Sequence, residues 1–102
     1  MIVVRSVFHA QFGKGGELAE AFKSAGAQMS AELGSTSRWR VLTDLSGPFD
    51  TVIQEVEVAS LAEWEQTRAK MFQSNSFRKT FGRIRSLIVD GRNELWTLEA
   101  QG

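Results

Sequence analysis

Hydrophobic and polar positions along the chain change their period several times, and each change marks a new element. Residues 2–12 are rich in β-branched and aromatic side chains with partial alternation, which predicts a strand. Glycines at 13, 15 and 16 interrupt it, and the apolar positions then follow one face of a helix from Glu17 onward. Gly34 is suited to end that helix. The helical face comprises Leu18, Phe22, Ala25 and Met29.

The same kinds of element follow in the second part of the chain. Residues 38–45 predict a strand, residues 46–50 form the strongest turn signal in the chain, and residues 51–58 alternate as a third strand. Ser60 and Glu63 form a capping box, in which each side chain satisfies the other's backbone donor. This box predicts the start of a second helix.

The last part of the chain is predicted to contain a short third helix and a final strand. The polar residues 74–76 interrupt the second helix, and a short third helix after them is expected to end near Gly82. Residues 85–99 then predict the last strand, with a bulge or tight turn at Asp90 and Gly91.

The order of these elements predicts the fold class. Strand, helix and strand occur twice, which is typical of an α+β, ferredoxin-like fold built on the split βαβ arrangement. Such a chain forms a four-stranded antiparallel sheet with the helices on one face. Right-handed crossovers would place the first strand between the third and the fourth, with the second strand outside the third. Residues 1–102 are expected to form a single domain.

Composition excludes several classes of site. The 102 residues include 12 basic and 12 acidic side chains, one histidine and no cysteine. Without cysteine there is no disulfide scaffold, zinc ribbon, iron–sulfur cluster or thiol nucleophile, and one histidine excludes a multi-histidine metal site. No metal and no cofactor are therefore expected.

Charge and hydropathy also bear on partners and location. The formal net charge of zero argues against a general polyanion binder, so nucleic acid is not an expected partner. No apolar run reaches the roughly 18 residues of a membrane span, and the N-terminus lacks the layout of a signal peptide. We expect a soluble, cytoplasmic protein that does not bind membranes.

The two faces of the predicted sheet differ in chemistry. One face is apolar and is expected to pack under the helices. Its members are Ile2, Val4, Phe8, Ala10, Phe12, Trp39, Val41, Leu45, Val52, Val56 and Val58. The other face holds too many charges for a sealed core and too many aliphatic residues for a solvated surface. Such a mixture suits a face covered by a second subunit, with a polar cavity or a lattice of ion pairs between them. Its charged members are Arg5, His9, Arg38, Arg40, Glu55 and Glu57.

Two interpretations of this charged set stay open. In the first, Glu55 and Glu57 lie between arginines of the neighbouring strands and form cross-strand ion pairs, each worth about 0.2–1 kcal/mol relative to Ala–Ala. In the second, the arginines bind a small acidic ligand and His9 relays a proton, with Glu55 or Glu57 orienting it. His9 and Glu55 are then the candidate catalytic residues. The candidate ligand-binding residues are Arg5, Arg38, Arg40 and Glu57.

Residues 68–85 form the one strong local charge bias, with six basic side chains and no acidic one. A segment of this kind can contact nucleic acid, an acidic membrane or an acidic partner. However, Phe72, Phe77 and Phe81 have core spacing, which leaves no aromatic platform for stacking bases. A solvated helix surface is the preferred interpretation of residues 68–85.

Short motifs in the chain resemble a known group of proteins. Residues 47–55, leading into residues 60–65, are similar to the NIPSNAP-like group of the dimeric α+β barrel superfamily, and residues 92–96 resemble that group's last strand. The antibiotic-biosynthesis monooxygenase group is the nearest alternative. The resemblance implies two sheets paired face to face around a central barrel, and hence a homodimer. No catalytic residue set carries over from either group.

The mixed face leads to two expectations for function. The first is a NIPSNAP-like protein that binds a small hydrophobic or aromatic acid, in a pocket between the helices and the sheet or inside the barrel. Whether it is an enzyme stays open; an enzyme of this kind would be a monooxygenase or isomerase that uses no cofactor. A haem enzyme is disfavoured, since no histidine follows His9 to serve as an axial ligand. The alternative is a non-enzymatic homodimeric interaction module.

Overall fold

The computed structural model describes residues 1–34 and 37–102, and its elements follow the predicted order. They are β1 (Ile2–Ala10), α1 (Gly15–Leu33), β2 (Trp39–Thr43), β3 (Thr51–Val58), α2 (Leu61–Gln73), α3 (Asn75–Ile84), the 3-10 helix η1 (Arg85–Leu87) and β4 (Ile88–Thr97). The third strand matches its prediction, whereas β4 begins at Ile88 rather than at residue 85. Within the described residues, no helix is long and apolar enough to cross a membrane.

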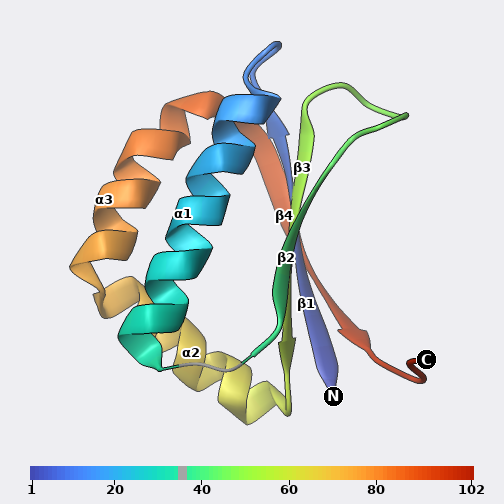
Figure 1. Cartoon of the computed structure of the whole chain (residues 1–102), viewed down its shortest axis with the longest axis vertical. Coiled ribbons are helices and arrows are strands. Elements are labelled where there is room, and N and C mark those ends of the chain that lie inside the picture. Colours follow the sequence, from blue (N-terminus) through green and yellow to red (C-terminus); the bar gives the residue numbers. More distant parts are fainter. Residues whose placement is uncertain (35–36) are drawn as a thin grey trace.

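Four antiparallel strands form one sheet in the order β2-β3-β1-β4, as the crossover rule predicts. The helices cover one face of this sheet, which we call the inner face, and leave the outer face bare (Figure 1). The α+β, ferredoxin-like fold class is thereby confirmed. Where β1 meets β4, the register shifts between His9 and Ala10, whose partners are Asp90 and Ile88. The predicted irregularity beside Asp90 is therefore a β-bulge.

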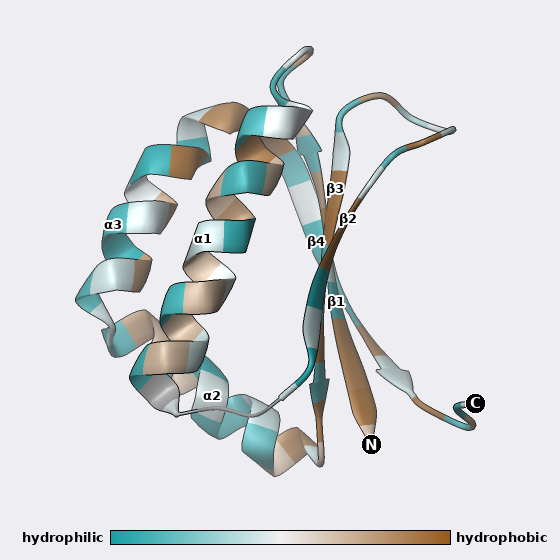
Figure 2. Cartoon of the chain, in the orientation of Figure 1, coloured by the Kyte–Doolittle hydropathy of each residue, from teal (hydrophilic) through white to brown (hydrophobic). Residues whose placement is uncertain are grey.

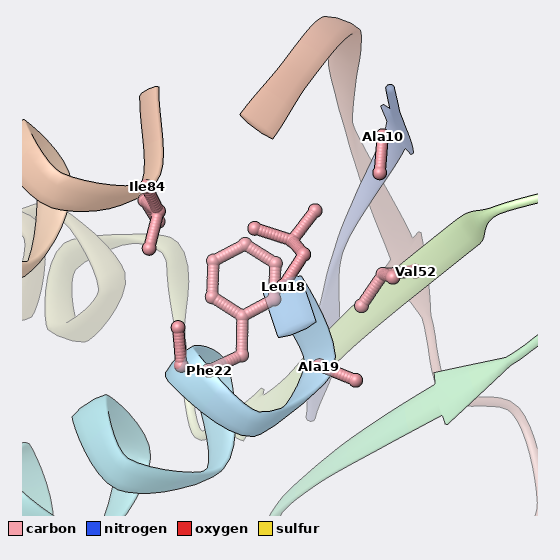
Figure 3. Close-up of a cluster of buried hydrophobic side chains, with 7 residues drawn as sticks. Ala10, Leu18, Ala19, Phe22, Val52 and Ile84 are labelled. Carbon is pink, nitrogen blue, oxygen red and sulfur yellow. The ribbon is translucent and has the colours of Figure 1, made fainter. Parts of the chain in front are cut away.

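A compact apolar cluster joins α1, α3 and one end of the sheet (Figure 3). Leu18 and Val52 have no exposed surface, and the Phe8 and Phe22 rings pack with centroids 5.1 Å apart. Of the predicted helical face of α1, Leu18 and Phe22 thus belong to the core, whereas Ala25 and Met29 are only half-buried and lie outside the cluster. The buried members of the cluster are Ala10, Leu18, Ala19, Ala21, Phe22, Val52 and Ile84.

Two residues predicted to pack under the helices lie outside the core. β1 ends at Ala10, so Phe12 falls in the following turn, is 85% exposed and contacts the edge of the Phe49 ring. β2 ends at Thr43, and Leu45 beyond it is fully exposed. The alternation of the sequence placed both residues on the inner face, but β1 and β2 end before Phe12 and Leu45 are reached.

Side-chain caps begin both helices of the second half. The Ser60 hydroxyl accepts a hydrogen bond from the Glu63 backbone N–H (3.1 Å), as predicted. The Glu63 carboxylate accepts from the backbone N–H of Ala59 (2.6 Å) rather than from that of Ser60, so the capping box is displaced by one residue. Ser74 ends α2 and begins α3, accepting a hydrogen bond from the Phe77 N–H (3.3 Å). α3 then continues past Gly82 to Ile84.

A carboxylate near the end of α1 ties that helix to the α2–α3 junction. Glu32 accepts hydrogen bonds from the hydroxyls of Ser74 (2.8 Å) and Ser76 (2.5 Å). The bond from Ser76, followed by that from Ser74, lowers the pKa of Glu32 below its ordinary value of 4.5. This contact holds α3 beside α1.

Asp50 connects three segments at the other end of the sheet. Its carboxylate accepts hydrogen bonds from the backbone N–H groups of Gly13 (2.8 Å) and Gly15 (3.0 Å), which precede and begin α1. Its carbonyl accepts from the N–H of Ala10, the last residue of β1. Asp50 itself has φ 59°, a left-handed conformation that aspartate tolerates better than most residues. One residue thus fixes the end of β1, the start of α1 and the start of β3.

We predict that Gly15→Ala destabilises the fold by about 1–3 kcal/mol, because a methyl group there would crowd Asp50. The added Cβ would lie 2.8 Å from Asp50 Oδ1 and 3.0 Å from its Cα. Gly16→Ala is the matched control, since its Cβ meets nothing within 4 Å and alanine is a better helix former. Urea unfolding measures both variants. Equal midpoints for the two would contradict the role of Asp50.

Candidate functional site

A cavity of about 670 Å³ lies between the helices and the inner face of the sheet. Small-molecule sites are typically about 300–1,000 Å³ and mostly apolar, with a few polar groups. The aromatic part of its wall comprises Phe8, Phe22, Trp39, Trp64, Phe72, Phe77 and Phe81. Its size and lining suit a small, largely apolar molecule.

Phe72, Phe77 and Phe81 form a wall of this cavity rather than a sealed core. Phe72 and Phe81 are 51% and 48% exposed, although their spacing predicted burial. Phe77 contacts both of them, edge-on to Phe72 and stacked on Phe81. The rings therefore pack against one another and leave a space above the sheet. Helical spacing is the same for a core face and a cavity wall, which is why the sequence did not separate the two.

A polar row crosses the floor of the cavity. Ser6 of β1 lies opposite Gln54 of β3 and Asn93 of β4. All three residues line the cavity, and the Ser6 hydroxyl donates to Asn93 Oδ1 (2.7 Å). Sequence analysis missed this row, although Ser6 interrupts the apolar alternation between Val4 and Phe8.

Two cations of the basic segment also line the cavity. Arg68 lies on α2, with its guanidinium 5.3 Å from the centre of the Phe72 ring, and Arg85 lies on η1. Across residues 1–34 and 37–102, no carboxylate pairs with either arginine. Sequence analysis interpreted this segment as a solvated surface, and both arginines are exposed. They also line the cavity, as do Asp90 and Arg92 of β4.

The outer face carries the predicted lattice of ion pairs, centred on Glu55. This carboxylate is 2.6 Å from Arg40 Nε and 3.6 Å from Arg5 Nη1, and the residue is only 8% exposed. The lattice crosses β2, β3 and β1, as the first interpretation of the charged set predicts. Figure 2 shows that hydrophilic and hydrophobic residues occur along the same strands.

The lattice continues onto β4 through residues that sequence analysis did not assign. Glu94 Oε1 is 3.8 Å from Arg5 Nε, and Glu94 Oε2 is 2.7 Å from Arg92 Nε. The indole N–H of Trp96 donates to Glu94 (2.9 Å). The hydrogen bonds from Arg92 and then Trp96, together with the charges of Arg92 and Arg5, lower the pKa of Glu94.

The other predicted site residues lie apart from this lattice. Glu57 forms no ion pair among the described residues, and it lines a recess of about 390 Å³ together with Arg38, Arg40 and Glu55. His9 contacts Asp90 (Nδ1 to Oδ1, 2.5 Å) instead of the expected Glu55 or Glu57. The reason is register, because the bulge in β4 places Asp90 opposite His9.

His9 and Glu55 are also separated along the sheet. His9 lies opposite Thr51, four residues along β3 from Glu55, which corresponds to about 13 Å. The structure thus brings Arg5, Arg40 and Glu55 together and leaves His9 elsewhere. In the described part of the chain, no cluster of histidine, aspartate and glutamate is arranged to hold a metal ion.

Comparison with solved structures gives the fold a name. An uncharacterized NIPSNAP domain protein from Burkholderia xenovorans matches with a TM-score of 0.83 and 16% identity over 98% of this chain and 96% of its own. A NIPSNAP family protein from Agrobacterium tumefaciens matches with a TM-score of 0.80 and 21% identity over 94% and 90%. This chain has the fold of a NIPSNAP domain.

The NIPSNAP fold is shared with a second group. A proposed antibiotic biosynthesis monooxygenase from Nitrosomonas europaea matches with a TM-score of 0.76 and 10% identity over 98% of this chain and all of its own. No protein-family model matches the chain, and no curated protein matches it by sequence. The predicted resemblance is confirmed for the fold. Because two groups share that fold, function has to be argued from the cavity and the outer face.

We predict that Glu55→Gln lowers the free energy of unfolding by about 1–3 kcal/mol, because two arginines would lose a nearly buried carboxylate. Glu57→Gln is the matched control on the same face of β3, and its effect is expected to stay within about 0.5 kcal/mol. Urea unfolding compares the two variants. An equal loss for both would show that Glu55 is not the centre of the lattice.

Proposed function

We propose that this protein binds a small hydrophobic or aromatic acid in the cavity between the helices and the inner face of the sheet. The observation that carries the proposal is the cavity itself, about 670 Å³ in volume and lined by aromatic rings. Trp39 is packed so closely on α1 that a Cβ at Gly26 would lie 2.8 Å from its ring. Such packing holds the Trp39 part of the wall in place, which favours a preformed site.

The acidic character of the ligand follows from the cations. Arg68 and Arg85 line the cavity without a carboxylate partner among the described residues, so a bound anion would supply the missing charge. Arginine binds planar carboxylates through two parallel hydrogen bonds. An aromatic ring against the apolar wall, with a carboxylate directed to one of these arginines, satisfies both features of the site.

A catalytic role for His9 and Glu55 stays a separate prediction. Alternation along β1 and β3 places both side chains on the outer face, opposite the cavity. A ligand on which they act would therefore have to lie on that face. The recess beside Arg38 and Arg40 includes Glu55 but not His9, so such a ligand would have to extend about 13 Å along the sheet to reach both. Turnover that depends on them would point to a reaction that uses no cofactor.

A pair of fluorescent probes tests the proposed function. Anilinonaphthalene sulfonate and N-phenylnaphthylamine share one ring skeleton, and only the first carries an acidic group. We predict that both bind and that the anionic probe binds about tenfold more tightly, because a charged hydrogen bond contributes about 1.5–3 kcal/mol. Arg68→Gln and Arg85→Gln should each reduce that preference.

Arg83→Gln is the control for this experiment, since Arg83 lies on α3 but does not line the cavity. Its probe affinities are expected to equal those of the natural chain. Failure of the folded natural chain to bind either probe would refute the proposed function. Thermal unfolding of each variant establishes that the folded state is the one that binds.

The outer face favours a second function, as a homodimeric interaction module. Trp96 is 58% exposed and Leu42 is 41% exposed on this face, beside the ion-pair lattice. The face carries charges of both signs, among them Arg5, Arg38, Arg40, Arg92, Glu55, Glu57 and Glu94. A second copy can therefore lie face to face with it without net repulsion, as a twofold contact requires.

Light scattering behind a sizing column tests this second function. We predict a mass near twice 11.4 kDa for the natural chain and a shift toward the monomer in Trp96→Arg. Leu61→Arg is the matched control, because Leu61 is also about half exposed (49%) but lies on α2, away from the outer face. A natural chain that is monomeric at high concentration would exclude the homodimer.

A further inference from the structure

We infer that the rim of the cavity mouth docks on the surface of an anionic membrane, where the hydrophobic acid of the proposed function would enter or leave the cavity. The ligand rests on the proposed function, whereas the docking can be measured without any ligand. The docking surface belongs to residues 68–85, whose six cations form no ion pair with any described residue.

The mouth of the cavity lies where residues of its wall are exposed to solvent. On the helix side the exposed wall residues are Arg68, Phe72, Phe81 and Arg85, and on the sheet side they are residues 90–93 of β4. Every other wall residue is buried or half-buried. The cavity therefore opens between the α2–α3 side of the helical layer and β4, the edge strand of the sheet.

One side of α3 belongs to this rim. Arg78, Phe81 and Arg85 follow one another at spacings of three and four residues, so they lie along one side of the helix. Arg78 Nε donates to the backbone carbonyl of Phe72 (3.1 Å), and the Arg68 guanidinium lies 5.3 Å from the centre of the Phe72 ring. These five residues form one surface, which we call the mouth rim.

The other two cations of α3 lie on a different side of the helix. Arg83 follows Arg78 by five residues, which is roughly 140° around the helix. Lys79 and Arg83 share a side with Ser76, whose hydroxyl bonds to Glu32 of the neighbouring helix α1 (Figure 1). A helix with its side chains is about 10–12 Å across, more than the Debye length of about 8 Å at physiological salt. Arg83 would therefore contribute little to a contact made at the mouth rim.

The unpaired charge at the mouth comes from the helix side. None of the three arginines of the mouth rim pairs with a carboxylate among the described residues. On the sheet side, Asp90 contacts His9 and Arg92 pairs with Glu94. A surface that approaches the mouth therefore meets three positive charges that no acid of this chain neutralises.

The mouth rim combines these charges with exposed aromatic surface. Phe72 and Phe81 are 51% and 48% exposed, and they stand beside the opening of an apolar cavity. Cations are attracted by acidic headgroups, while phenylalanines enter the boundary between headgroups and acyl chains. A nucleic acid would need aromatic faces free for stacking, whereas both rings already pack against Phe77. An anionic bilayer matches both features of the mouth rim.

The sequence led to the expectation of a protein that does not bind membranes, because no apolar run is long enough to span one and the net charge is zero. Docking on a surface requires no membrane span. A net charge averages over the whole chain, whereas the attraction to an anionic surface depends on the charges within about a Debye length of it. The mouth rim presents positive charge there.

Co-sedimentation with phosphatidylcholine vesicles, with and without phosphatidylglycerol, tests the docking. We expect the natural chain to bind only the vesicles that contain phosphatidylglycerol, and to bind them more weakly at high salt. Arg78→Gln should weaken binding about fivefold, the effect of one cation near an anionic surface, whereas Arg78→Lys should retain it. Arg83→Gln is the matched control on the same helix, and its affinity should change by less than about twofold.

A fluorescent reporter tests whether the aromatic part of the mouth rim enters the bilayer. Phe72→Trp adds a tryptophan at the rim, and phospholipids brominated on their acyl chains should quench this added fluorescence. Leu61→Trp is the matched control, because Leu61 is 49% exposed on the same helix but does not line the cavity. The tryptophan added there should not be quenched. Equal quenching of the two would contradict docking through the mouth rim.

The outcomes separate the docking from the proposed function. If the natural chain does not bind anionic vesicles, or if Arg83→Gln weakens binding as much as Arg78→Gln, docking through the mouth rim is refuted. A single-stranded oligonucleotide that binds more tightly than the vesicles and displaces them would also refute it. The naphthalene probes report on the cavity separately, and Arg78→Gln should bind them as the natural chain does, since Arg78 does not line the cavity. Vesicle binding without probe binding would refute the proposed function and leave the docking.

Discussion

The carboxylate of Asp50 holds together the end of the molecule from which the rest of the fold is positioned. The carboxylate accepts hydrogen bonds from the backbone N–H groups of Gly13 and Gly15, and the backbone carbonyl of Asp50 accepts one from the N–H of Ala10. β1, α1 and β3 come from three different stretches of the sequence, and this residue is their common point. Because α1 starts there at a fixed place above the sheet, the helix packs Leu18 and Phe22 onto the strands beside it.

The cavity exists because the apolar side chains pack tightly at only one end of the space between the helices and the sheet. The buried cluster lies near the Asp50 end, and α2 contributes no buried residue at all. At the other end α1 is held by Glu32, which contacts the α2–α3 junction through Ser74 and Ser76. Polar contacts thus keep the helices in place where apolar side chains do not fill the space. A domain closed by packing alone would have collapsed onto the sheet there.

Periodicity predicted the elements, because one buried face imposes one period on each element, and the right-handed crossover rule then predicted the strand order. It failed where two arrangements share a period, as for Phe72 and Phe81, which have core spacing but form a cavity wall. It also failed where contacts depend on register between distant strands. The His9–Asp90 contact requires the bulge in β4, and the row at Ser6 requires two strand pairings at once. Neither is visible in a single strand.

The two faces of the sheet carry different chemical groups because successive side chains of each strand point to opposite faces. Arg5 and Ser6 are adjacent in sequence, yet one joins the ion-pair lattice of the outer face and the other the floor of the cavity. On the outer face, Glu55 and Glu94 pair with arginines of the same chain, whereas Glu57 forms no ion pair among the described residues and Arg5 Nε has no hydrogen-bond partner there. On the inner face, Gln54 forms no side-chain hydrogen bond and Arg68 and Arg85 pair with no carboxylate among the described residues. A ligand can supply partners for such groups, and in this NIPSNAP fold the cavity offers them beside an aromatic wall.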